Sequence, residues 1–291
     1  MKRTAIIIIV AALLAACGQS YEETKRITRE QRREAARKDS AALKIAVMPT
    51  LDCLPLFVAK KEQLLDSLHG GVRLKMYNAQ MDCDTAIARG RVEGAVTEFI
   101  RAQRLERQGT ELRHVGKTSA YWQLVTNRLS RIRQLRQLSD KMVGMTRYSL
   151  TDSLCTFIAD TAKVAKDRMF RIQLNDVNVR LQMLQNNEVD AVWLTEPQAT
   201  VARMQKNAVI FDSRSVWKTP GELVFRTHEM QRKERAQQLE LLVKAYNKAC
   251  QLINERGVRH YKELIAQYCQ VKPAVVDSLP PIQFTELTTA Q

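Results

Sequence analysis

Leu43-Lys44-Ile45-Ala46-Val47-Met48-Pro49 is the stretch that decides the fold, together with the segment Leu54-Pro55-Leu56-Phe57-Val58-Ala59-Lys60 that soon follows it. The first is a short apolar run that stops at Pro49, which predicts a buried strand over 43–47. Pro55 then opens a helix that we expect to reach Leu65, because proline is favoured in the first turn of a helix. A buried strand followed directly by a helix is typical of a parallel α/β sheet.

The same alternation continues along the chain in two series. The first series predicts strands over 72–77 and 94–97 and helices over 84–89 and 99–105, and His114 also lies inside a predicted strand. The second predicts a helix over 149–165 and strands over 121–126, 142–145, 170–174, 191–194 and 209–211. After a strand over 223–226, helices are predicted over 239–253, 261–268 and 273–279.

A short internal similarity suggests that the two series share one design. Arg91-Val92-Glu93-Gly94-Ala95-Val96 is echoed by Glu188-Val189-Asp190-Ala191-Val192, and an acidic residue follows each predicted strand, Glu98 in one and Glu196 in the other. A match this short also arises by chance, so coincidence is the alternative to a structural repeat.

We therefore predict an α/β protein of two Rossmann-like lobes whose sheets are mainly parallel. The first lobe takes residues 41–125 plus 222–291, because the strand over 223–226 returns to it, and the second takes residues 126–221. The chain then crosses twice between the lobes, which predicts a hinge with a cleft beside it.

The N-terminus predicts export and a lipid anchor. Lys2 and Arg3 precede an apolar run over 4–16, which is shorter than the roughly 20 residues of a membrane-spanning helix and is typical of a signal peptide. Leu14-Ala15-Ala16-Cys17 resembles the lipobox of bacterial lipoproteins. The resemblance implies cleavage of residues 1–16 and a lipid (diacylglycerol, palmitate) on Cys17. Residues 17–40 would then be the lipidated cysteine and a charged tether, because 21–40 has almost nothing apolar to bury.

The formal net charge of +15 does not indicate a nucleic-acid partner. Export argues against one, and the basic stretches over 25–38 and 101–136 lack interleaved aromatic residues or zinc-ligand spacing. We expect these charges to lie on solvated helix faces or near an anionic membrane surface.

Five cysteines remain after Cys17, so at least one thiol is unpaired or pairs with another chain. Cys53 with Cys83, or Cys250 with Cys269, are the pairings left open; Cys155 is the fifth. There is no Cys-x-x-Cys motif and no histidine cluster, so we predict no metal site and no cofactor.

Three segments resemble the type II periplasmic solute-binding proteins of ABC importers, closest to the NMT1/THI5-like (SsuA-like) branch. They are the opening segment 44–60, Leu138-Ser139-Asp140-Lys141-Met142-Val143-Gly144-Met145, and Glu188-Val189-Asp190-Ala191-Val192-Trp193-Leu194-Thr195-Glu196-Pro197. The resemblance implies a monomer that closes two lobes on a small-molecule solute and delivers it to an ABC permease of the inner membrane. With the lipid anchor, it implies a location in the cell envelope, facing the periplasm.

In open parallel sheets, ligands lie beyond the carboxyl ends of the strands, where helix N-termini offer unpaired N–H groups. We therefore predict that the loops after the strands of both lobes contact the solute. For any one position, an ordinary helix cap or turn is the alternative. The predicted ligand-binding residues are Thr50, Leu51, Asp52, Gln80, Asp82, Thr97 and Glu98 in the first lobe and Tyr148, Ser149, Thr151, Asp152, Trp193 and Glu196 in the second.

These loops are rich in carboxylates and poor in basic groups, with Arg147 the nearest. We hypothesise a solute with an amine or heteroaromatic group, stacked on Tyr148 or Trp193. The alternative is that several of the acids are helix caps that face solvent. Tight binding of simple oxyanions, with none of amines or heteroaromatics, would contradict the hypothesis.

Two other functions compete with solute import. Related two-lobed folds include enzymes, but His69, His114, His228 and His260 form no constellation, and no nucleophile or phosphate-loop motif is present, so we predict no catalytic residues. An accessory or sensory lipoprotein that kept the fold and lost transport is the second alternative, and no feature of the sequence excludes it.

Overall fold

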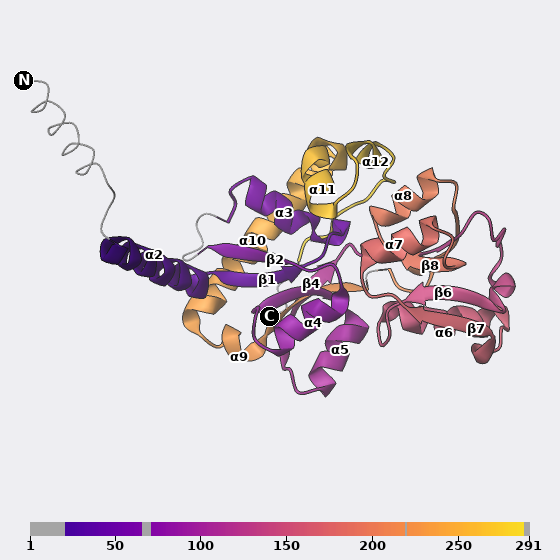
Figure 1. The fold of residues 1–291 in the computed structure, drawn as a ribbon, viewed down its shortest axis with the longest axis horizontal. Helices are drawn as coiled ribbons and strands as arrows, with labels where there is room; N and C mark the ends of the chain where they lie inside the picture. Colours follow the sequence, from indigo (N-terminus) through magenta and orange to yellow (C-terminus); the bar gives the residue numbers. More distant parts are fainter. Residues whose placement is uncertain (1–20, 66–70, 219, 288–291) are drawn as a thin grey trace, which may run out of the picture. The chain divides into compact units, whose positions relative to one another are not determined.

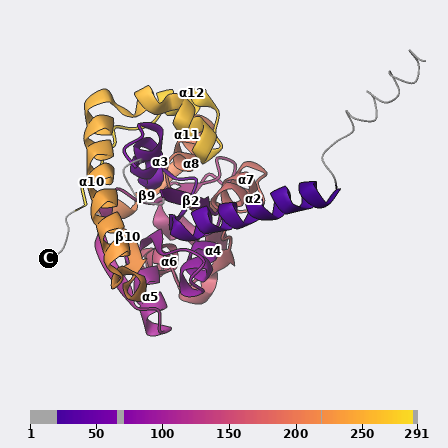
Figure 2. The same cartoon turned by 90° about the vertical axis from the view of Figure 1, so that its left-hand side faces the viewer.

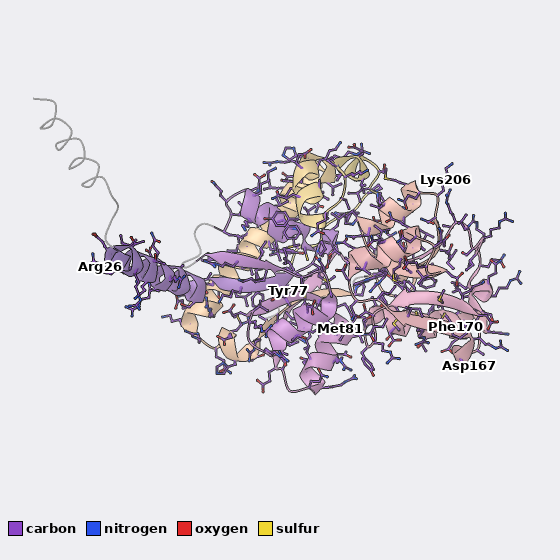
Figure 3. All side chains as sticks on the ribbon, in the orientation of Figure 1. Arg26, Tyr77, Met81, Asp167, Phe170 and Lys206 are labelled. Carbon is purple, nitrogen blue, oxygen red and sulfur yellow. The ribbon has the colours of Figure 1, made fainter. Side chains whose placement is uncertain are left out.

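The computed structural model describes residues 21–65, 71–218 and 220–287, which fall into two units. The first contains the helix α2 (Tyr21–Ala41), whose described side chains, Arg26 among them, are mostly polar and largely exposed (Figure 3). The predicted signal peptide 1–16 and Cys17 lie outside the described residues. Within the described part of the chain, no helix is both long and apolar enough to cross a membrane.

The second unit, from Leu43 onward, contains two sheets, and the first of them combines strands from both ends of its sequence. Its order is β2-β1-β3-β10-β4: β1 pairs in parallel with β2 and β3, and β10 runs antiparallel to β3 and β4. Figure 1 labels β1, β2 and β4 of this sheet. The strands are β1 (Leu43–Val47), β2 (Val72–Met76), β3 (Gly94–Glu98), β4 (Leu112–Thr118) and β10 (Gly221–Arg226).

Helices cover both faces of this sheet. The short helix η1 (Leu51–Cys53) leads into α3 (Leu54–Lys61), and α4 (Gln80–Ala88) and α5 (Phe99–Arg107) follow β2 and β3. The C-terminal helices are α9 (Thr227–Met230), α10 (Lys233–Arg256), η5 (Val258–Tyr261), α11 (Lys262–Cys269) and α12 (Pro273–Asp277). α10 is the long helix of this group, with α11 and α12 beyond its end (Figure 2), and it packs against α3.

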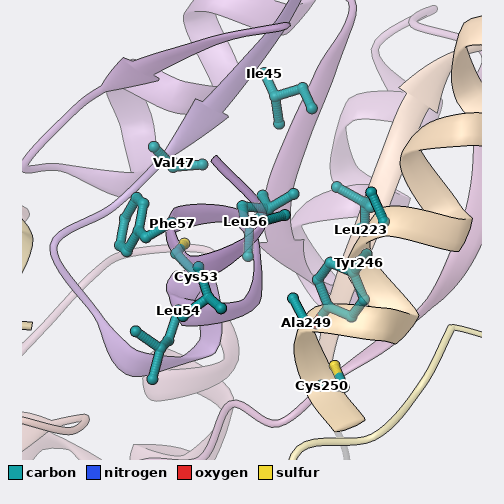
Figure 4. Close-up of a cluster of buried hydrophobic side chains, with 14 of the residues drawn as sticks. Ile45, Val47, Cys53, Leu54, Leu56, Phe57, Leu223, Tyr246, Ala249 and Cys250 are labelled. Atoms are coloured by element: carbon teal, nitrogen blue, oxygen red, sulfur yellow. The ribbon is translucent and has the colours of Figure 1, made fainter. Parts of the chain in front are cut away.

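The core of the first lobe forms where α3 and α10 meet the sheet. Leu56 and Phe57 of α3 are fully buried, together with Tyr246 of α10 and Leu223 of β10 (Figure 4). Phe57 also stacks on Tyr268, with ring centroids 4.2 Å apart. Burying aromatic and aliphatic side chains in this way is the main favourable term in folding, and it fixes β1 and the loop after it.

The second sheet is built from the middle of the chain. Its order is β7-β6-β8-β5-β9, with β6 parallel to β7 and β8, and β5 antiparallel to β8 and β9. Its strands are β5 (Gln123–Thr126), β6 (Lys141–Met145), β7 (Met169–Gln173), β8 (Ala191–Leu194) and β9 (Ala208–Asp212). Its helices are η2 (Leu135–Leu138), α6 (Leu150–Ala162), η3 (Lys166–Arg168), α7 (Val177–Gln185), α8 (Gln198–Met204) and η4 (Ser213–Ser215).

The two sheets have the same design, as the internal similarity predicted. β2-β1-β3 corresponds to β7-β6-β8, and in each sheet the next strand is antiparallel. The repeated acids also correspond: the Glu93 carboxylate accepts the Lys44 N–H at 2.8 Å in the first sheet, and the Asp190 carboxylate accepts the Met142 N–H at 2.9 Å in the second. The repeat is therefore structural.

The chain crosses between the sheets after β4 and again after β9. The crossings are joined by two hydrogen bonds: the Trp122 N–H donates to Ser213 Oγ at 2.9 Å, and the Ser213 N–H donates to the Trp122 carbonyl at 2.8 Å. All of β5 pairs within the second sheet, so the first crossing precedes the expected boundary at 125/126. The apolar run over 121–126 could not reveal this boundary, because either sheet would bury it.

The five cysteines of the described chain are all buried and free. Neither of the pairings left open by the sequence is formed. Burial raises the pKa of each thiol, to about 12 for Cys155 and Cys250, which keeps them protonated and unreactive at neutral pH.

Candidate functional site

A cavity of about 50 Å³, enough for a few water molecules, lies between the two lobes at the carboxyl ends of their strands. Met48 follows β1 and Glu98 ends β3, while Thr146 follows β6 and Thr195 follows β8. This is where open parallel sheets bind ligands. The lining residues are Met48, Thr50, Asp52, Gln80, Thr97, Glu98, Arg101, Trp122, Thr146, Ser149, Leu150, Thr151, Asn175, Val177, Arg180 and Thr195.

The structure brings together about half of the predicted ligand-binding residues. Those that line the cavity are Thr50, Asp52, Gln80, Thr97, Glu98, Ser149 and Thr151. Leu51, Asp82, Tyr148, Asp152, Trp193 and Glu196 are not among the lining residues. The predicted loops therefore do surround the cavity, whereas the direction of individual side chains did not follow from loop position. Contact with solute stays a prediction for every one of these residues.

Two of the residues outside the lining are buried parts of the second lobe. Trp193 is fully buried edge-on against Phe211, and its Nε1 donates to Cys155 Sγ at 3.2 Å. The Glu196 carboxylate accepts hydrogen bonds from the Thr200 N–H and hydroxyl, from Tyr121 and from Arg203. Both side chains serve the structure of their own lobe.

The others lie at the rim of the cavity or in turns. Tyr148 is 55 % exposed, and the Arg104 guanidinium of the first lobe stacks over its ring at 4.1 Å. The Asp152 carboxylate accepts the Tyr148 N–H and pairs with Arg171. Asp82 is exposed in the first turn of α4, and Leu51 is a buried residue of η1. Asp152 thus lies in the first turn of α6, whose N-cap is Ser149, and it stabilises the start of that helix.

Two arginines of the lining, Arg101 and Arg180, were not predicted from the sequence, and each is about 4 % exposed. Arg147, the basic group nearest the predicted loops, is exposed and does not line the cavity. The loops themselves have few basic groups, as predicted, but the helices behind them add two to the cavity. A signal did exist: Arg180 lies in the apolar stripe Val177, Arg180, Leu181 and Leu184, at the spacing of a buried helix face.

The lobes are closed on one another around the cavity by direct hydrogen bonds. The Leu150 N–H of α6 donates to Glu98 Oε1 at 2.9 Å, and the Val177 N–H of α7 donates to the Asn78 carbonyl at 3.2 Å. On the hinge side, the Leu51 N–H donates to the Glu196 carbonyl at 2.9 Å. Met81 of α4 lies where the lobes meet (Figure 3), and its sulfur accepts from Gln173 at 3.4 Å.

Burial dominates the electrostatics of the cavity. It raises the pKa of Glu98 to about 7, against the backbone N–H groups of Leu150 and Ile100, which lower it. Burial likewise raises the pKa of Asp52 and lowers that of Arg180 to about 10. Arg180 therefore stays charged at neutral pH, whereas Glu98 gains or loses its proton close to neutral pH.

The residue types of the lining are those of a small-molecule binding site. Trp122, Met48, Val177 and Leu150 supply apolar surface, and the remaining lining residues supply hydroxyls, amides and four charged groups. The lining contains no cysteine or histidine, and the described chain has no cluster of His, Cys, Asp and Glu that could hold a metal ion. Polar groups that converge on a cavity beside apolar surface are typical of small-molecule sites.

Two α/β lobes of like topology, closed on a polar cavity beside a two-crossing hinge, define the class of two-lobed binding folds. The sequence matches the family described as NMT1/THI5 like over residues 52–256, and the chain belongs to that family. No curated protein sequence matches the chain.

Solved structures agree on the fold. The alkanesulfonate-binding protein SsuA from Xanthomonas axonopodis pv. citri, bound to MOPS, is similar with a TM-score of 0.72 at 17% identity, covering 85% of this chain and 87% of that one. The periplasmic aliphatic sulphonate binding protein SsuA from Escherichia coli gives a TM-score of 0.68 at 16% identity, over 84% and 86%. The desulfurization enzyme DszB is similar with a TM-score of 0.58 at 14% identity, covering 82% of this chain and 83% of that one. These matches confirm the predicted type II periplasmic binding protein fold.

Proposed function

We propose that this protein is the solute-binding component of an ABC importer, closing its two lobes on a small solute and delivering it to a permease. The observation that carries the proposal is the cavity itself: both sheets direct the carboxyl ends of their strands into it, and hydrogen bonds between the lobes close it. Solute binding would shift an open–closed equilibrium in proportion to the solute's greater affinity for the closed form.

Membership of the NMT1/THI5-like family and similarity to two sulfonate-binding proteins support this function. The proposal extends to the N-terminus: a lipid on Cys17 would hold the protein at a membrane, with the lobes in the periplasm and α2 as part of the tether. The size of the cavity favours a small solute, and we expect the protein to act as a monomer.

Native mass spectrometry of the purified protein, before and after gentle denaturation, tests solute binding. We expect a retained small molecule in the native spectrum that is released on unfolding. A protein that is empty, and whose melting temperature does not respond to amines, pyrimidines, sulfonates or oxyanions, would favour the accessory or sensory function instead.

Catalysis is the competing function, since one of the similar structures is an enzyme. It predicts that an isolated solute changes mass on incubation with the protein, which the same spectra would detect. A solute that is released unchanged after prolonged incubation supports binding.

The lipid anchor needs a separate test. Metabolic labelling with an azide-bearing fatty acid should mark the wild-type chain, and Cys17→Ser should lose both the label and the membrane-bound fraction. Cys53→Ser is the matched control, since Cys53 is buried and should not be lipidated. A C17S chain that stays labelled would contradict the anchor.

A further inference from the structure

Four charged side chains line the cavity, and they differ in whether the protein itself compensates their charge. They are Asp52, Glu98 and Arg101 from the first lobe and Arg180 from the second. A buried charge without an opposite charge or strong hydrogen bonds is costly, so a group that the protein leaves uncompensated indicates what a ligand supplies.

Glu98 is compensated by two helix N-termini. It is 2 % exposed, and its Oε2 accepts the Ile100 N–H of α5 at 2.8 Å while its Oε1 accepts the Leu150 N–H of α6 at 2.9 Å. The next free N–H of α6, on Thr151, is taken by Ser149 Oγ. Glu98 thus occupies the place where these helix N-termini would otherwise hold an external anion.

Arg101 is compensated by Asp84. Both side chains are buried and form an ion pair, and Arg101 Nη1 also donates to the Arg147 carbonyl at 3.0 Å across the lobes. The pair is neutral overall, so neither member offers its charge to a solute.

Arg180 is different, because within the described chain no carboxylate lies within ion-pairing distance of it. Its guanidinium donates to the Trp193 carbonyl at 2.8 Å, to Thr146 Oγ1 at 2.6 Å and twice to the Leu174 carbonyl. A guanidinium has five N–H donors, so one N–H on Nη1 has no acceptor among the described residues. Those acceptors are neutral. The Asp176 carboxylate acts on the charge of Arg180 from a distance, but it caps α7 through the Asn178 and Val179 N–H groups and forms no ion pair with Arg180.

Asp52 is the counterpart in the opposite lobe. It follows β1 in the loop of η1, is half-buried, and has no cationic partner within ion-pairing distance among the described residues. The Thr50 hydroxyl and the N–H groups of its own loop hydrogen-bond to it, much as backbone N–H groups do to Glu98. The two acids differ in that the Arg101 charge also lowers the pKa of Glu98, whereas only hydrogen bonds lower the pKa of Asp52. Neither charge compensates the other, since Asp52 is not among the charges that act on Arg180.

We propose that the solute is a small zwitterion, whose anionic group pairs with Arg180 of the second lobe and whose ammonium group pairs with Asp52 of the first. The apolar side chains of Trp122, Met48 and Val177 would contact the part of the solute between its two charges. Because each charge binds a different lobe, such a solute favours the closed form over the open one. This inference rests on the proposed solute-binding function and adds the chemical class of the solute.

Isothermal titration with three matched series of probes tests the class. The series are short ω-aminoalkanesulfonates and ω-amino acids of increasing length, the alkanesulfonates of the same lengths, and the alkylamines of the same lengths. We expect a zwitterion of one length to bind at least about tenfold more tightly than either singly charged analogue, because each analogue leaves one buried charge unpaired.

Two variants test the binding of the ammonium group and of the anionic group of the solute separately. Asp52→Asn should reduce affinity for the zwitterion to about that for the alkanesulfonate, and Arg180→Gln should reduce it to about that for the alkylamine. Arg180 also holds backbone carbonyls, so if R180Q does not fold, D52N alone decides. Asp167→Asn, in an exposed position outside the lining, is the matched control and should leave all affinities unchanged.

Three outcomes would overturn the inference. They are an alkanesulfonate or alkylamine that binds as tightly as the zwitterion, a zwitterion preference that survives D52N, and a retained solute of another charge type in the native spectra. In each of these cases the proposed function stands. If no probe binds and the native spectra show no solute, both the inference and the proposed function fail.

Discussion

Glu98 and Glu196 lie at the carboxyl ends of corresponding strands but one position out of step, and they stabilise different things. Glu98 ends β3, Glu196 lies two residues after β8, and each is buried. Counted from Glu93 and Asp190, whose carboxylates make equivalent hydrogen bonds, Glu98 corresponds to Thr195. Glu98 reaches across the cleft to the N-terminus of α6, while the Glu196 side chain is held by Tyr121, Thr200 and Arg203. The first therefore couples the two lobes, and the second holds one lobe and its hinge segment together.

The difference teaches that two acids at the ends of corresponding strands are not equivalent when they are one position out of step, because neighbouring residues of a strand point to opposite faces. Glu98 has a backbone N–H of the other lobe within reach only when the cleft is closed, so its contribution depends on conformation. The side-chain partners of Glu196 lie on α8 and in the first crossing, at Tyr121, and do not depend on the closing N–H of α6. Four predictions, ordered from the largest expected effect to the smallest, test this contrast.

Replacing Glu196 should affect stability most. Glu196→Ala leaves Arg203, Tyr121 and Thr200 without their shared acceptor, and breaking a buried ion pair from one side costs about 3 kcal/mol. Urea unfolding should show this loss in the free energy of unfolding. Glu188→Ala, at an exposed acid in the same repeat, should change it by less than about 0.5 kcal/mol. An equal change in the free energy of unfolding in the two variants would contradict the structural role assigned to Glu196.

Glu98 should make stability depend on pH. Burial raises its pKa from 4.5 to about 7, so its contribution to stability is fully present below the unfolded pKa and is lost as pH rises through about 7. Arg101 opposes the shift and Asp84 adds to it. Between about pH 4 and about pH 8, the free energy of unfolding should fall by up to about 3 kcal/mol more in wild type than in Glu98→Gln.

The check is urea unfolding of both proteins at a series of pH values. Parallel curves for wild type and E98Q would mean that Glu98 titrates at its ordinary pKa and is not buried as described.

Shortening Glu98 should open the lobes without unfolding them. Aspartate is a good N-cap, so Glu98→Asp keeps the cap on α5 but is one methylene too short to reach Leu150. Losing one charge-assisted hydrogen bond of about 2 kcal/mol shifts the open–closed equilibrium roughly 30-fold towards open. Fluorescence energy transfer between dyes on the two lobes measures it, with Glu111→Asp as the exposed control. An unchanged distance distribution would contradict the coupling role.

The smallest effect is expected at the rim of the cleft. Arg104 of the first lobe lies over the Tyr148 ring of the second, and an exposed cation–π contact is worth about 0.5–1 kcal/mol. Arg104→Gln should therefore weaken closure by only about threefold in the same assay. If R104Q weakened closure as much as E98D does, the contact at the rim would couple the lobes as strongly as the Glu98 carboxylate, which would contradict this order.

The sequence predicted the lobes better than it predicted the cavity. Buried strands and proline-opened helices are local patterns, and they gave the α/β class, most strands and the loops that surround the cavity. Side-chain direction was the weak point. In β8, Val192, Trp193 and Leu194 are all buried, so the two-residue period that would tell cleft from core is absent, and Trp122 of the first crossing lines the cavity instead of Trp193.

Arginines in the cavity were missed for a related reason. Loop residues after strands were taken as the source of charge, whereas Arg101 and Arg180 extend from within helices α5 and α7. The long side chain of an arginine can reach a cavity from a helix that lies behind the rim of that cavity. Whether the charge of the arginine is then available to a solute depends on the partners of its side chain. Asp84 is such a partner for Arg101, and sequence spacing alone does not pair them.

Small-angle X-ray scattering of the protein with its retained solute, and again after the solute has been removed by unfolding and refolding, tests the central claim most directly. The account predicts a larger radius of gyration for the solute-free protein and a return to the compact value when the solute is added back. The same radius of gyration in all three states would contradict a cleft that closes on a solute.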